Sequence, residues 1–492
     1  MSVARLLKLA LVWAIVSGVF VVLIPSQLAD PFIRADDFPA ILRQPELFYP
    51  KTLSEGRWIN WLWMHRPVAG DPRALYLLYL ALWALFAATV ALSVMREVRW
   101  PVLPALVGVA MAVMPGAALL SLWFGTLLPL GLLLAIFGGV VLAGSAQTVE
   151  RSMLAIIPLV LLCHSTAPLL MLVAAAAGAR PHPGGWSGLR LAVAFVLGLA
   201  LGLGLIALLN GLWHGVWGMR VSEWRAGNPF DGPEDLGPNA AQIALSLQTM
   251  AGAMFLGQPV LMATAAFLVL AAGLGLLGAR REARAAVGRV LLALALSFSI
   301  ALVHMMQSGV AWPPRAFGFL WAGLVLIAAL AMAEARGPRR LVPGAMLALL
   351  AATGGTVWSL WIEGPPATWQ RWSKTLSQNV QALSDMPAPV LLIDGDLHSV
   401  PEAQVLFESY GLAGRLRLTG EITLRLCRPY RPRYWHVGEA ALIDDVQVDR
   451  ALCDRHRSAL NALPVHPGPG ALAPLAPGVV ALRLPRVSAG SP

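Results

Sequence analysis

The chain has 492 residues, of which 58% are hydrophobic and only 13% are charged. A soluble protein of this length carries about twice that charged fraction, so the composition excludes an ordinary soluble enzyme and predicts a polytopic membrane protein. The formal net charge of +10 is not read as a nucleic-acid footprint, because the sequence holds no basic module interleaved with aromatic residues.

Apolar runs of roughly 20 residues recur along the chain before residue 363, and such runs are typical of spanning helices. The N-terminal run is long for a signal peptide and has no evident cleavage site, so we expect an uncleaved first span. The sequence predicts eleven spans, at 6–26, 74–95, 100–115, 117–143, 152–163, 166–178, 189–212, 259–279, 289–309, 316–334 and 341–362. Breaks at Pro115-Gly116 and at 163–168 leave short segments, which we interpret as half-helices with polar backbone turned toward a cavity.

Basic residues fall on one side of this predicted topology. Fourteen Lys or Arg and four Glu lie in the segments assigned to the cytoplasm, which are the N-terminus, 95–100, 144–151, 178–190, 279–289 and 334–340. The other loops and the tail are close to neutral, as the positive-inside rule requires. We therefore expect a multi-pass membrane protein with a cytoplasmic N-terminus and a transmembrane domain at 1–362. Its outside parts are the loops 27–73 and 213–258 and a soluble tail, 363–492.

The fold class expected is an all-α membrane bundle followed by a soluble α/β or α+β domain. In the tail, 390–394 predicts a buried strand, 402–410 a helix ended by Gly411, and the alternation at 415–418 a second strand.

The rest of the tail is rich in Pro, Gly and Ala at 464–480, where we expect loose structure. Cys427 and Cys453 both lie in the tail, in an oxidising compartment if the topology holds, and are predicted to form a disulfide. Cys163 is expected to be a buried structural thiol. The Gly- and Pro-rich second half of the 213–239 stretch predicts a solvated flexible loop.

Two adjacent carboxylates, Asp36 and Asp37, follow the first span, where a charge is costly unless it is hydrated. A structural explanation is that Asp36 caps a helix beginning at Phe38, which leaves the other carboxylate without a role. The functional explanation is general-base catalysis in a membrane enzyme that joins a sugar to a hydroxyl group.

Cations and aromatic rings share this loop. Arginine matches phosphate oxygens bidentately, so the loop arginines suit a departing phosphate. The aromatic residues around Trp58 suit either the membrane interface or stacking on a sugar ring, and both explanations stay open. These groups are Arg34, Arg57, Arg66, Phe48, Tyr49, Trp58, Trp61 and Trp63.

A short N-terminus, one span and then a long outside loop that opens on adjacent acidic residues resembles the GT-C superfamily of membrane glycosyltransferases. The stretch "ADDF", followed by "EGRWINWLW", is similar to bacterial lipid-linked-sugar glucosyltransferases that modify O-antigen. The resemblance covers the first 66 residues or so; beyond them it is one of hydropathy, and it does not include the tail.

The resemblance implies a catalytic base at Asp37 as first choice, or at Asp36. It implies a polyprenyl-phosphate-linked sugar as donor and inverting transfer to a glycan or lipid acceptor outside the cytoplasm. Glu55 and Arg57 match the second recurring element of the family pattern and are carried over as donor or acceptor contacts, with Trp58 beside them.

Three further residues are candidates for substrate binding. His164 lies where an apolar helix breaks and either satisfies free carbonyl groups or binds a donor phosphate. Arg315, in the turn "SGVAWPPR", either snorkels to the interface or clamps the lipid phosphate. His304, about three turns earlier, is the weaker candidate, and a structural role is favoured for it.

No group of His, Asp or Glu has firm metal-ligand spacing, so we predict no cofactor, although some members of the family use a divalent ion. The alternative function is a transporter or flippase of lipid-linked saccharides, in which an internal duplication of spans is common but is not seen here. A polymerase or ligase with the same donor chemistry also fits the sequence, as does a non-catalytic scaffold.

Overall fold

The chain folds into two units in the computed structural model, which describes residues 2–34, 37–68, 70–180, 187–220, 227–277, 280–335, 340–400, 409–428 and 448–486. Unit 1 comprises Met1–Ala29 and Pro39–Leu360, and unit 2 comprises Asp30–Phe38 and Trp361–Pro492. The division near residue 360 lies close to the predicted boundary at 362. The segment Asp30–Phe38 is predicted to be part of the first outside loop, but it belongs to unit 2.

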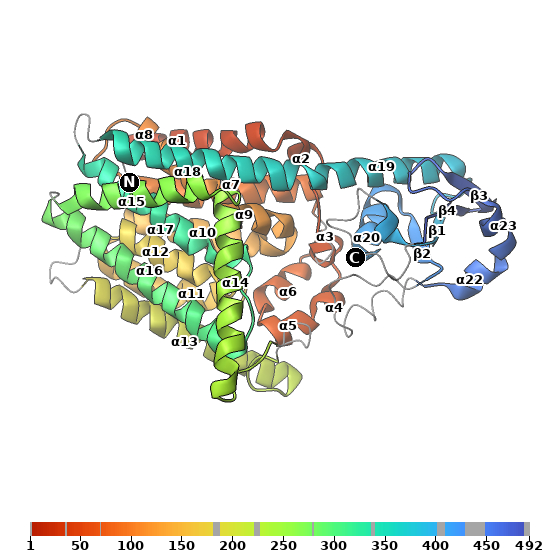
Figure 1. Ribbon diagram of the computed structural model, residues 1–492, viewed down its shortest axis with the longest axis horizontal. Helices are drawn as coiled ribbons and strands as arrows, with labels where there is room; N and C mark the ends of the chain where they lie inside the picture. The colour runs from red at the N-terminus through yellow and green to blue at the C-terminus, as the bar shows by residue number, and fades with distance from the viewer. Residues whose placement is uncertain are drawn as a thin grey trace. The chain divides into compact units, whose positions relative to one another are not determined.

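Every element described in unit 1 is a helix (Figure 1). The longer ones are α1 (Val3–Leu23), α7 (Pro72–Val94), α10 (Phe124–Ala143), α11 (Ala146–Leu161), α13 (Ser187–His214), α14 (Leu236–Phe255), α15 (Pro259–Leu277), α16 (Arg281–Ser308), α17 (Gly318–Glu334) and α18 (Leu341–Trp358). The shorter ones are α2 (Pro25–Ala29), α3 (Phe38–Leu42), α4 (Pro45–Phe48), α5 (Pro50–Glu55), α6 (Trp58–Met64), α8 (Val102–Ala112), α9 (Pro115–Leu120), α12 (Ala167–Gly178) and the turns η2 (Ser121–Trp123), η4 (Pro233–Asp235) and η5 (Pro314–Phe317).

Capping side chains and prolines set the helix limits. The Asp71 carboxylate accepts hydrogen bonds from the backbone N–H groups of Arg73 and Ala74, at 3.2 and 3.4 Å, and Pro72 takes the first helical position of α7. The Ser145 hydroxyl accepts from the N–H of Thr148 in the same way at the start of α11. Each of the eleven predicted span ranges contains helix.

Among the described residues, seven helices are long and apolar enough to cross a membrane, or eight if the bent pair α14 and α15 counts as one span. The chain is thus a helical membrane protein with a small C-terminal sheet. The eleven full crossings are not confirmed, because α8, α11 and α12 have only 11, 16 and 12 residues. A straight crossing takes about 20 residues, so these helices are too short to cross unaided.

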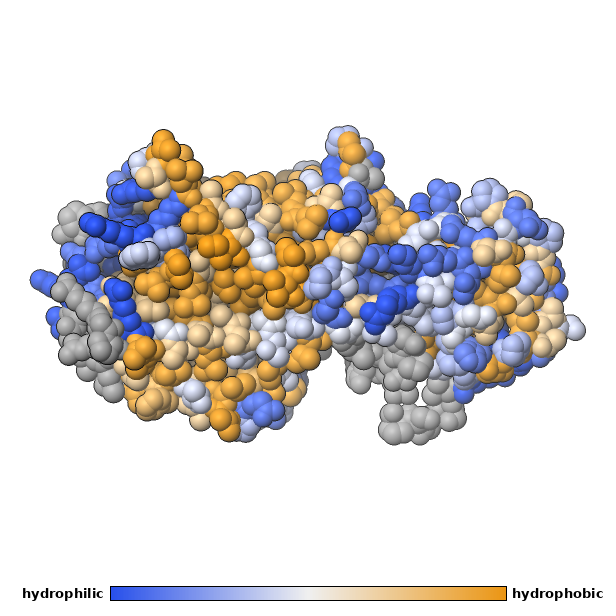
Figure 2. Space-filling view, turned by 90° about the horizontal axis from the view of Figure 1, so that it is seen from above, coloured by the Kyte–Doolittle hydropathy of each residue, from blue (hydrophilic) through white to orange (hydrophobic). Residues whose placement is uncertain are grey.

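Segments predicted to lie in the cytoplasm meet at one end of unit 1. Arg280 pairs with Glu334 at 2.6 Å and with Glu97 at 3.1 Å, and Arg190 lies 3.8 Å from Glu150. Figure 2 shows polar residues at the end of unit 1 where the chain begins and apolar residues over the adjoining helices. These contacts agree with placing the segments on one membrane face; that this face is cytoplasmic stays a prediction.

The second outside loop contains the helix α14, which begins at Leu236, so the flexible loop predicted for the second half of 213–239 is wrong for 236–239. α14 bends by 88° into α15. Hydrogen bonds from Asn239 fix the start of this helix, because its side-chain amide donates to the carbonyls of Asn228 and Met306, both at 2.9 Å. The hydroxyl of Ser246 accepts from the N–H of Trp312 at 2.8 Å. The composition rule failed because these partners lie far away in sequence.

Unit 2 contains a four-stranded sheet with strand order β2-β1-β4-β3. β1 pairs in parallel with β2 and β4, while β3 is antiparallel to β4. The strands are β1 (Val390–Asp394), β2 (Thr423–Leu426), β3 (Leu472–Ala476) and β4 (Val479–Arg483), and the helices are η7 (Ser359–Glu363), α19 (Pro365–Leu383), η8 (Leu397–Ser399), α20 (Ser409–Gly420), α22 (Arg450–Arg455) and α23 (Arg457–Ala462). The predicted strand at 390–394 is present.

Two predictions in the tail are wrong. Residues 415–418 belong to α20, because Leu412 and Leu416, four residues apart, are both fully buried on one helix face. Residues 464–480 contain β3 and the start of β4, joined through Gly478 at φ +73°. The predicted helix 402–410 lies largely outside the described residues, and the helix that follows runs through Gly411.

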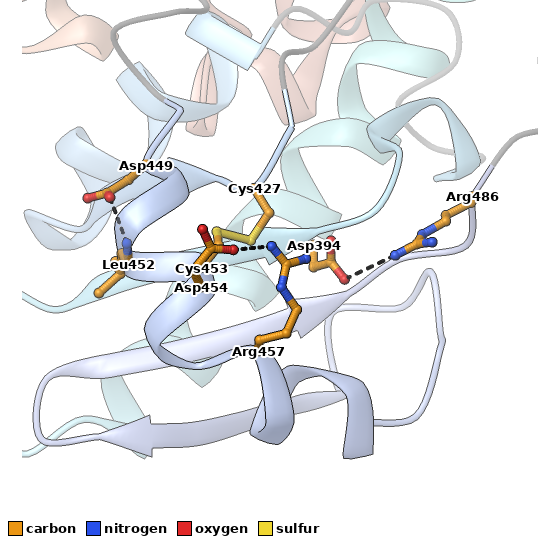
Figure 3. The surroundings of a disulfide bond; sticks show 8 residues. All are labelled: Asp394, Cys427, Asp449, Leu452, Cys453, Asp454, Arg457 and Arg486. Atoms are coloured by element: carbon orange, nitrogen blue, oxygen red, sulfur yellow. Dashed lines mark hydrogen bonds and ion pairs between the residues drawn. A yellow bond between two sulfur atoms is a disulfide. The ribbon is translucent and has the colours of Figure 1, made fainter.

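Cys427 and Cys453 form a disulfide, with their Cα atoms 5.6 Å apart. Figure 3 shows it linking the end of β2 to α22, whose first turn is capped by the Asp449 carboxylate accepting from the N–H of Leu452 at 2.9 Å. Cys453 is buried with Leu392 of β1 in the small core of this unit. Cys163 is a free, buried thiol, as predicted.

An ion pair holds the segment Asp30–Phe38 within unit 2. The Arg415 guanidinium donates to both carboxylate oxygens of Asp30, with Nη1 to Oδ1 at 2.8 Å, and the Gln370 amide donates to the Asp30 carbonyl. The Phe38 ring packs against Gly414, where a Cβ atom would clash with it. The segment carrying the acidic pair is thus fixed from α19 and α20.

Labelling of thiols tests the disulfide and the compartment of the tail together. Protein purified without reductant, denatured and treated with N-ethylmaleimide should take up one label, on Cys163, and three labels after reduction. Three labels before reduction would contradict both the disulfide and an oxidising location.

Replacing Arg415 tests the attachment of the acidic segment. Arg415→Ala should raise hydrogen exchange in peptides covering residues 30–34, because a charge-assisted bidentate contact worth about 1.5–3 kcal/mol is lost. Arg417→Ala, an exposed position of the same helix, is the matched control. Equal exchange in the two variants would show that the ion pair does not hold the segment.

Candidate functional site

The first outside loop of unit 1 folds into the short helices α4, α5 and α6. Prolines start α4 and α5, and Gly56 ends α5 in the left-handed region at φ +69°. A Cβ at Gly56 would lie 2.8 Å from the Ile206 side chain, so the loop packs closely against α13. Glycine at this position lets α6 begin shortly after α5 ends.

Glu55 and Arg57, predicted as substrate contacts, pair with each other. The Arg57 Nε lies 2.5 Å from the Glu55 carboxylate, and their side chains are only 17% and 7% exposed, for Arg57 and Glu55 respectively. Neither residue lines the cavity of unit 1 that contains His164 and Arg315. The pair fixes the turn between α5 and α6.

Trp58 anchors the loop in the protein interior and is only 3% exposed. Its indole Nε1 donates to the Asn210 Oδ1 at 2.8 Å, and its ring meets Trp61 edge-on with the centroids 5.8 Å apart. Tyr49, Trp213 and His214 also pack against Trp58 in this aromatic cluster. Trp58 therefore packs the outside loop against α13, which carries Asn210.

α6 also supplies hydrogen-bond donors to the break in the membrane helices. α11 ends at Leu161, and the carbonyl groups that follow have no helical partners. The N–H of Ile59 donates to the Leu162 carbonyl at 3.2 Å, and the Asn60 amide donates to the Cys163 carbonyl at 2.9 Å. Hydrogen bonds from the outside loop therefore stabilise the non-helical turn before His164.

A cavity of about 480 Å³ lies beside this break, and His164 and Arg315 both line it. His164 is 8% exposed, and its Nδ1 lies 3.3 Å from the Thr166 hydroxyl. The Arg315 guanidinium lies 5.0 Å from the centre of the Trp123 ring. The other lining residues are Tyr79, Trp83, Met114, Gly116, Leu120, Leu130, Gly131, Leu134, Thr166, Ala167, Leu170, Ala316, Gly318 and Phe319.

The shape of the cavity depends on a small residue at 116. A Cβ at Gly116 would lie 3.3 Å from the Arg315 carbonyl oxygen, closer than an ordinary contact. The break at Pro115-Gly116 and the turn carrying Arg315 therefore pack against each other. Two breaks predicted from sequence meet at one cavity.

The charges of the cavity favour an anion. Its ionisable lining residues include Arg315 and His164 but neither Asp nor Glu. α12 begins at Ala167, also in the lining, so the positive end of its dipole lies at the wall. Four leucines and three aromatic rings are among the other lining residues. Such a site suits a ligand that joins a phosphate to apolar or ring-shaped groups.

Asp37, the favoured base, is fully buried and lies in unit 2, one residue before α3. Its backbone N–H donates to the Arg34 carbonyl at 2.9 Å. Asp36, the second choice, lies outside the described residues. His304 is not among the cavity residues; its Nδ1 accepts from the Trp312 indole at 3.1 Å, which agrees with the structural role favoured for it.

Sequence reasoning missed the aromatic wall of the cavity. Tyr79 and Trp83 both lie on α7, four residues apart, and the spacing was a usable signal for a shared helix face. Thr166, which lies within the predicted break 163–168 and lines the cavity, was not singled out. The sequence of an apolar helix does not show which of its aromatic side chains face a cavity and which face lipid.

Among the residues that the structure describes, no group of three or more His, Cys, Asp or Glu is placed to hold a metal ion. No protein-family model, curated protein or solved structure matches the chain.

The Trp58–Asn210 hydrogen bond should be a main anchor of the outside loop. Trp58→Phe leaves the Oδ1 of the fully buried Asn210 without this donor, so the free energy of unfolding should fall by about 1–3 kcal/mol. Thermal unfolding in detergent, followed by circular dichroism, measures the change. Trp100→Phe, at a position 75% exposed and outside this loop, is the control. Equal stability of the two variants would contradict the anchoring role.

Proposed function

We propose that this protein is a GT-C-type membrane glycosyltransferase that transfers a sugar from a polyprenyl-phosphate-linked donor to an extracytoplasmic glycan or lipid acceptor. The observation that supports it best is the cavity of unit 1, in which Arg315 and His164 lie among aromatic and aliphatic walls. A lipid-linked sugar is a phosphate joined to an apolar chain and a sugar ring, and each part has a matching surface there.

The carrier phosphate is assigned to Arg315. A guanidinium can donate two parallel hydrogen bonds to phosphate oxygens, and its interaction is strengthened where water is scarce. His164, from the break between α11 and α12, supplies a second polar group. Tyr79 and Trp83 offer ring faces to the sugar, while Leu130 and Leu134 offer apolar surface to the first isoprene units.

The general base is proposed from the sequence and is Asp37, with Asp36 as the second choice. The acceptor hydroxyl gives its proton to the Asp37 carboxylate, and its oxygen forms a bond to the anomeric carbon. The bond from that carbon to the phosphate oxygen breaks at the same time, and the phosphate keeps the electron pair. Attack opposite to the leaving group inverts the anomeric configuration.

Glu55 and Arg57 receive a changed role in this proposal. Because they pair with each other away from the cavity, we assign them to positioning the outside loop rather than to contact with donor or acceptor. Trp58 has the same role through Asn210. His304 has no part in binding.

The finer architecture belongs to the same proposal. It comprises eleven crossings, a cytoplasmic N-terminus, the bacterial inner membrane and a periplasmic tail. The ion pairs that join 95–100, 279–289 and 334–340 support a common face for these segments. The disulfide of unit 2 supports an oxidising compartment for the tail.

Reconstitution separates binding from chemistry. In proteoliposomes, undecaprenyl-phosphate-linked radiolabelled hexoses and pentoses serve as donors and a cell-envelope extract as acceptor. Asp37→Asn should lower transfer by about 10²–10⁴-fold because a general base is lost. Binding of undecaprenyl phosphate, measured by native mass spectrometry, should stay unchanged in this variant. Arg315→Leu should weaken that binding by about 10- to 100-fold, the equivalent of one charge-assisted contact.

Arg73→Gln is the matched control, since Arg73 is an exposed cation in the first turn of α7. It should behave as the wild type does in both assays. Full transfer by both Asp37→Asn and Asp36→Asn would contradict the assigned chemistry. Movement of donor across the bilayer without any transfer by the wild type would instead identify a flippase.

A further inference from the structure

A second pocket of about 480 Å³ lies in unit 1, lined by cations. Its lining residues are Arg5, Lys8, Leu92, Arg96, Leu142 and Arg180. α12 lines the cavity of Arg315 with Ala167 and Leu170 of its first turn, and Arg180, just after its last residue, lines this pocket. α7 lines that cavity from its middle, with Tyr79 and Trp83, and lines this pocket with Leu92 near its end. The two pockets therefore lie at different levels along the same helices.

Arg96 forms the inner wall of this pocket. Its guanidinium donates to the Val141 carbonyl at 2.7 Å and to the Gly178 carbonyl at 2.8 Å, so it caps the carboxyl ends of α10 and α12. Its Nε is buried and has no hydrogen-bond partner among the described residues. A buried, charged donor without a partner is costly, and an anion in the pocket would remove that cost.

The described residues that line the pocket include four cations but neither Asp nor Glu, so the lining itself does not balance the charge of Arg96. Burial, and then the nearby cations Arg180 and Arg5, lower the pKa of Arg96 to about 10. The adjacent Glu97 is directed to Arg280 at 3.1 Å. Within the described part of the chain, neither Arg5 nor Arg180 takes part in an ion pair that would lower the repulsion.

We propose that this pocket binds the phosphate group of an anionic membrane lipid. Leu92 and Leu142 supply apolar wall beside the cations, as an acyl chain next to a headgroup requires. The pocket is also placed at helix ends, where lipid headgroups meet a spanning bundle. Free phosphate shares the same charge chemistry, and the experiment distinguishes the two sources. The inference does not depend on the glycosyltransferase proposal.

Basic residues are common on the cytoplasmic side of membrane proteins whether or not they bind a ligand. The test must therefore distinguish a specific anion-binding pocket from general positive charge on this face. Arg99 is an exposed cation near the same end of unit 1 but does not line the pocket. Arg99→Gln therefore removes the same charge as a pocket substitution without touching the site. Arg5→Gln combined with Arg180→Gln removes two exposed cations of the pocket and leaves the helix-capping Arg96 in place.

Native mass spectrometry of the full chain in detergent measures binding of phosphatidylglycerol, phosphatidylcholine and inorganic phosphate. The wild type and Arg99→Gln should retain phosphatidylglycerol equally, and the Arg5/Arg180 double variant should bind it at least about tenfold more weakly. A preference for phosphatidylglycerol over inorganic phosphate supports the lipid source. Tight binding of inorganic phosphate alone, lost in the double variant, would keep the anion site but overturn the lipid. Equal phosphatidylglycerol binding by the double variant and Arg99→Gln would overturn the site.

Discussion

A helix that stops inside an apolar bundle leaves carbonyl groups without partners, and in this setting each must be satisfied by protein. The interruption between α11 and α12 meets this requirement through α6, whose Ile59 and Asn60 donate to the carbonyls of Leu162 and Cys163. The outside loop is therefore part of the bundle. The cavity lies beside this break in the helix, and both His164 and Arg315 line it. Its shape therefore depends on the non-helical conformation between α11 and α12.

The two pockets of unit 1 differ in charge. In one, a single arginine and a histidine lie among rings and leucines, which suits one phosphate on an apolar molecule. In the other, four cations surround the pocket, and Arg96 closes it by capping two helices. The short helix α12 takes part in both, because its early start and early end bring a polar terminus to each wall.

Much of unit 1 could be predicted from hydropathy, including both helix breaks, since apolar length and proline act locally. The joining of His164 and Arg315 at one cavity could not, because residues about 150 apart in sequence meet only through packing. In unit 2 the strand 390–394 and the Cys427–Cys453 pair were predictable. The alternation at 415–418 misled, because Asp30 and the buried face of α20 fix that segment as a helix. Likewise, the family pattern predicts Glu55 as a substrate contact, whereas in the structure its carboxylate pairs with the Arg57 guanidinium.

We propose that the cavity of unit 1 holds the phosphate of a lipid carrier, and a cryo-EM map of the protein in nanodiscs with undecaprenyl phosphate would show whether it does. We expect phosphate density within hydrogen-bond distance of the Arg315 guanidinium, with the first isoprene units along Leu130 and Leu134. An empty cavity, with the carrier bound at another surface of the bundle, would contradict it.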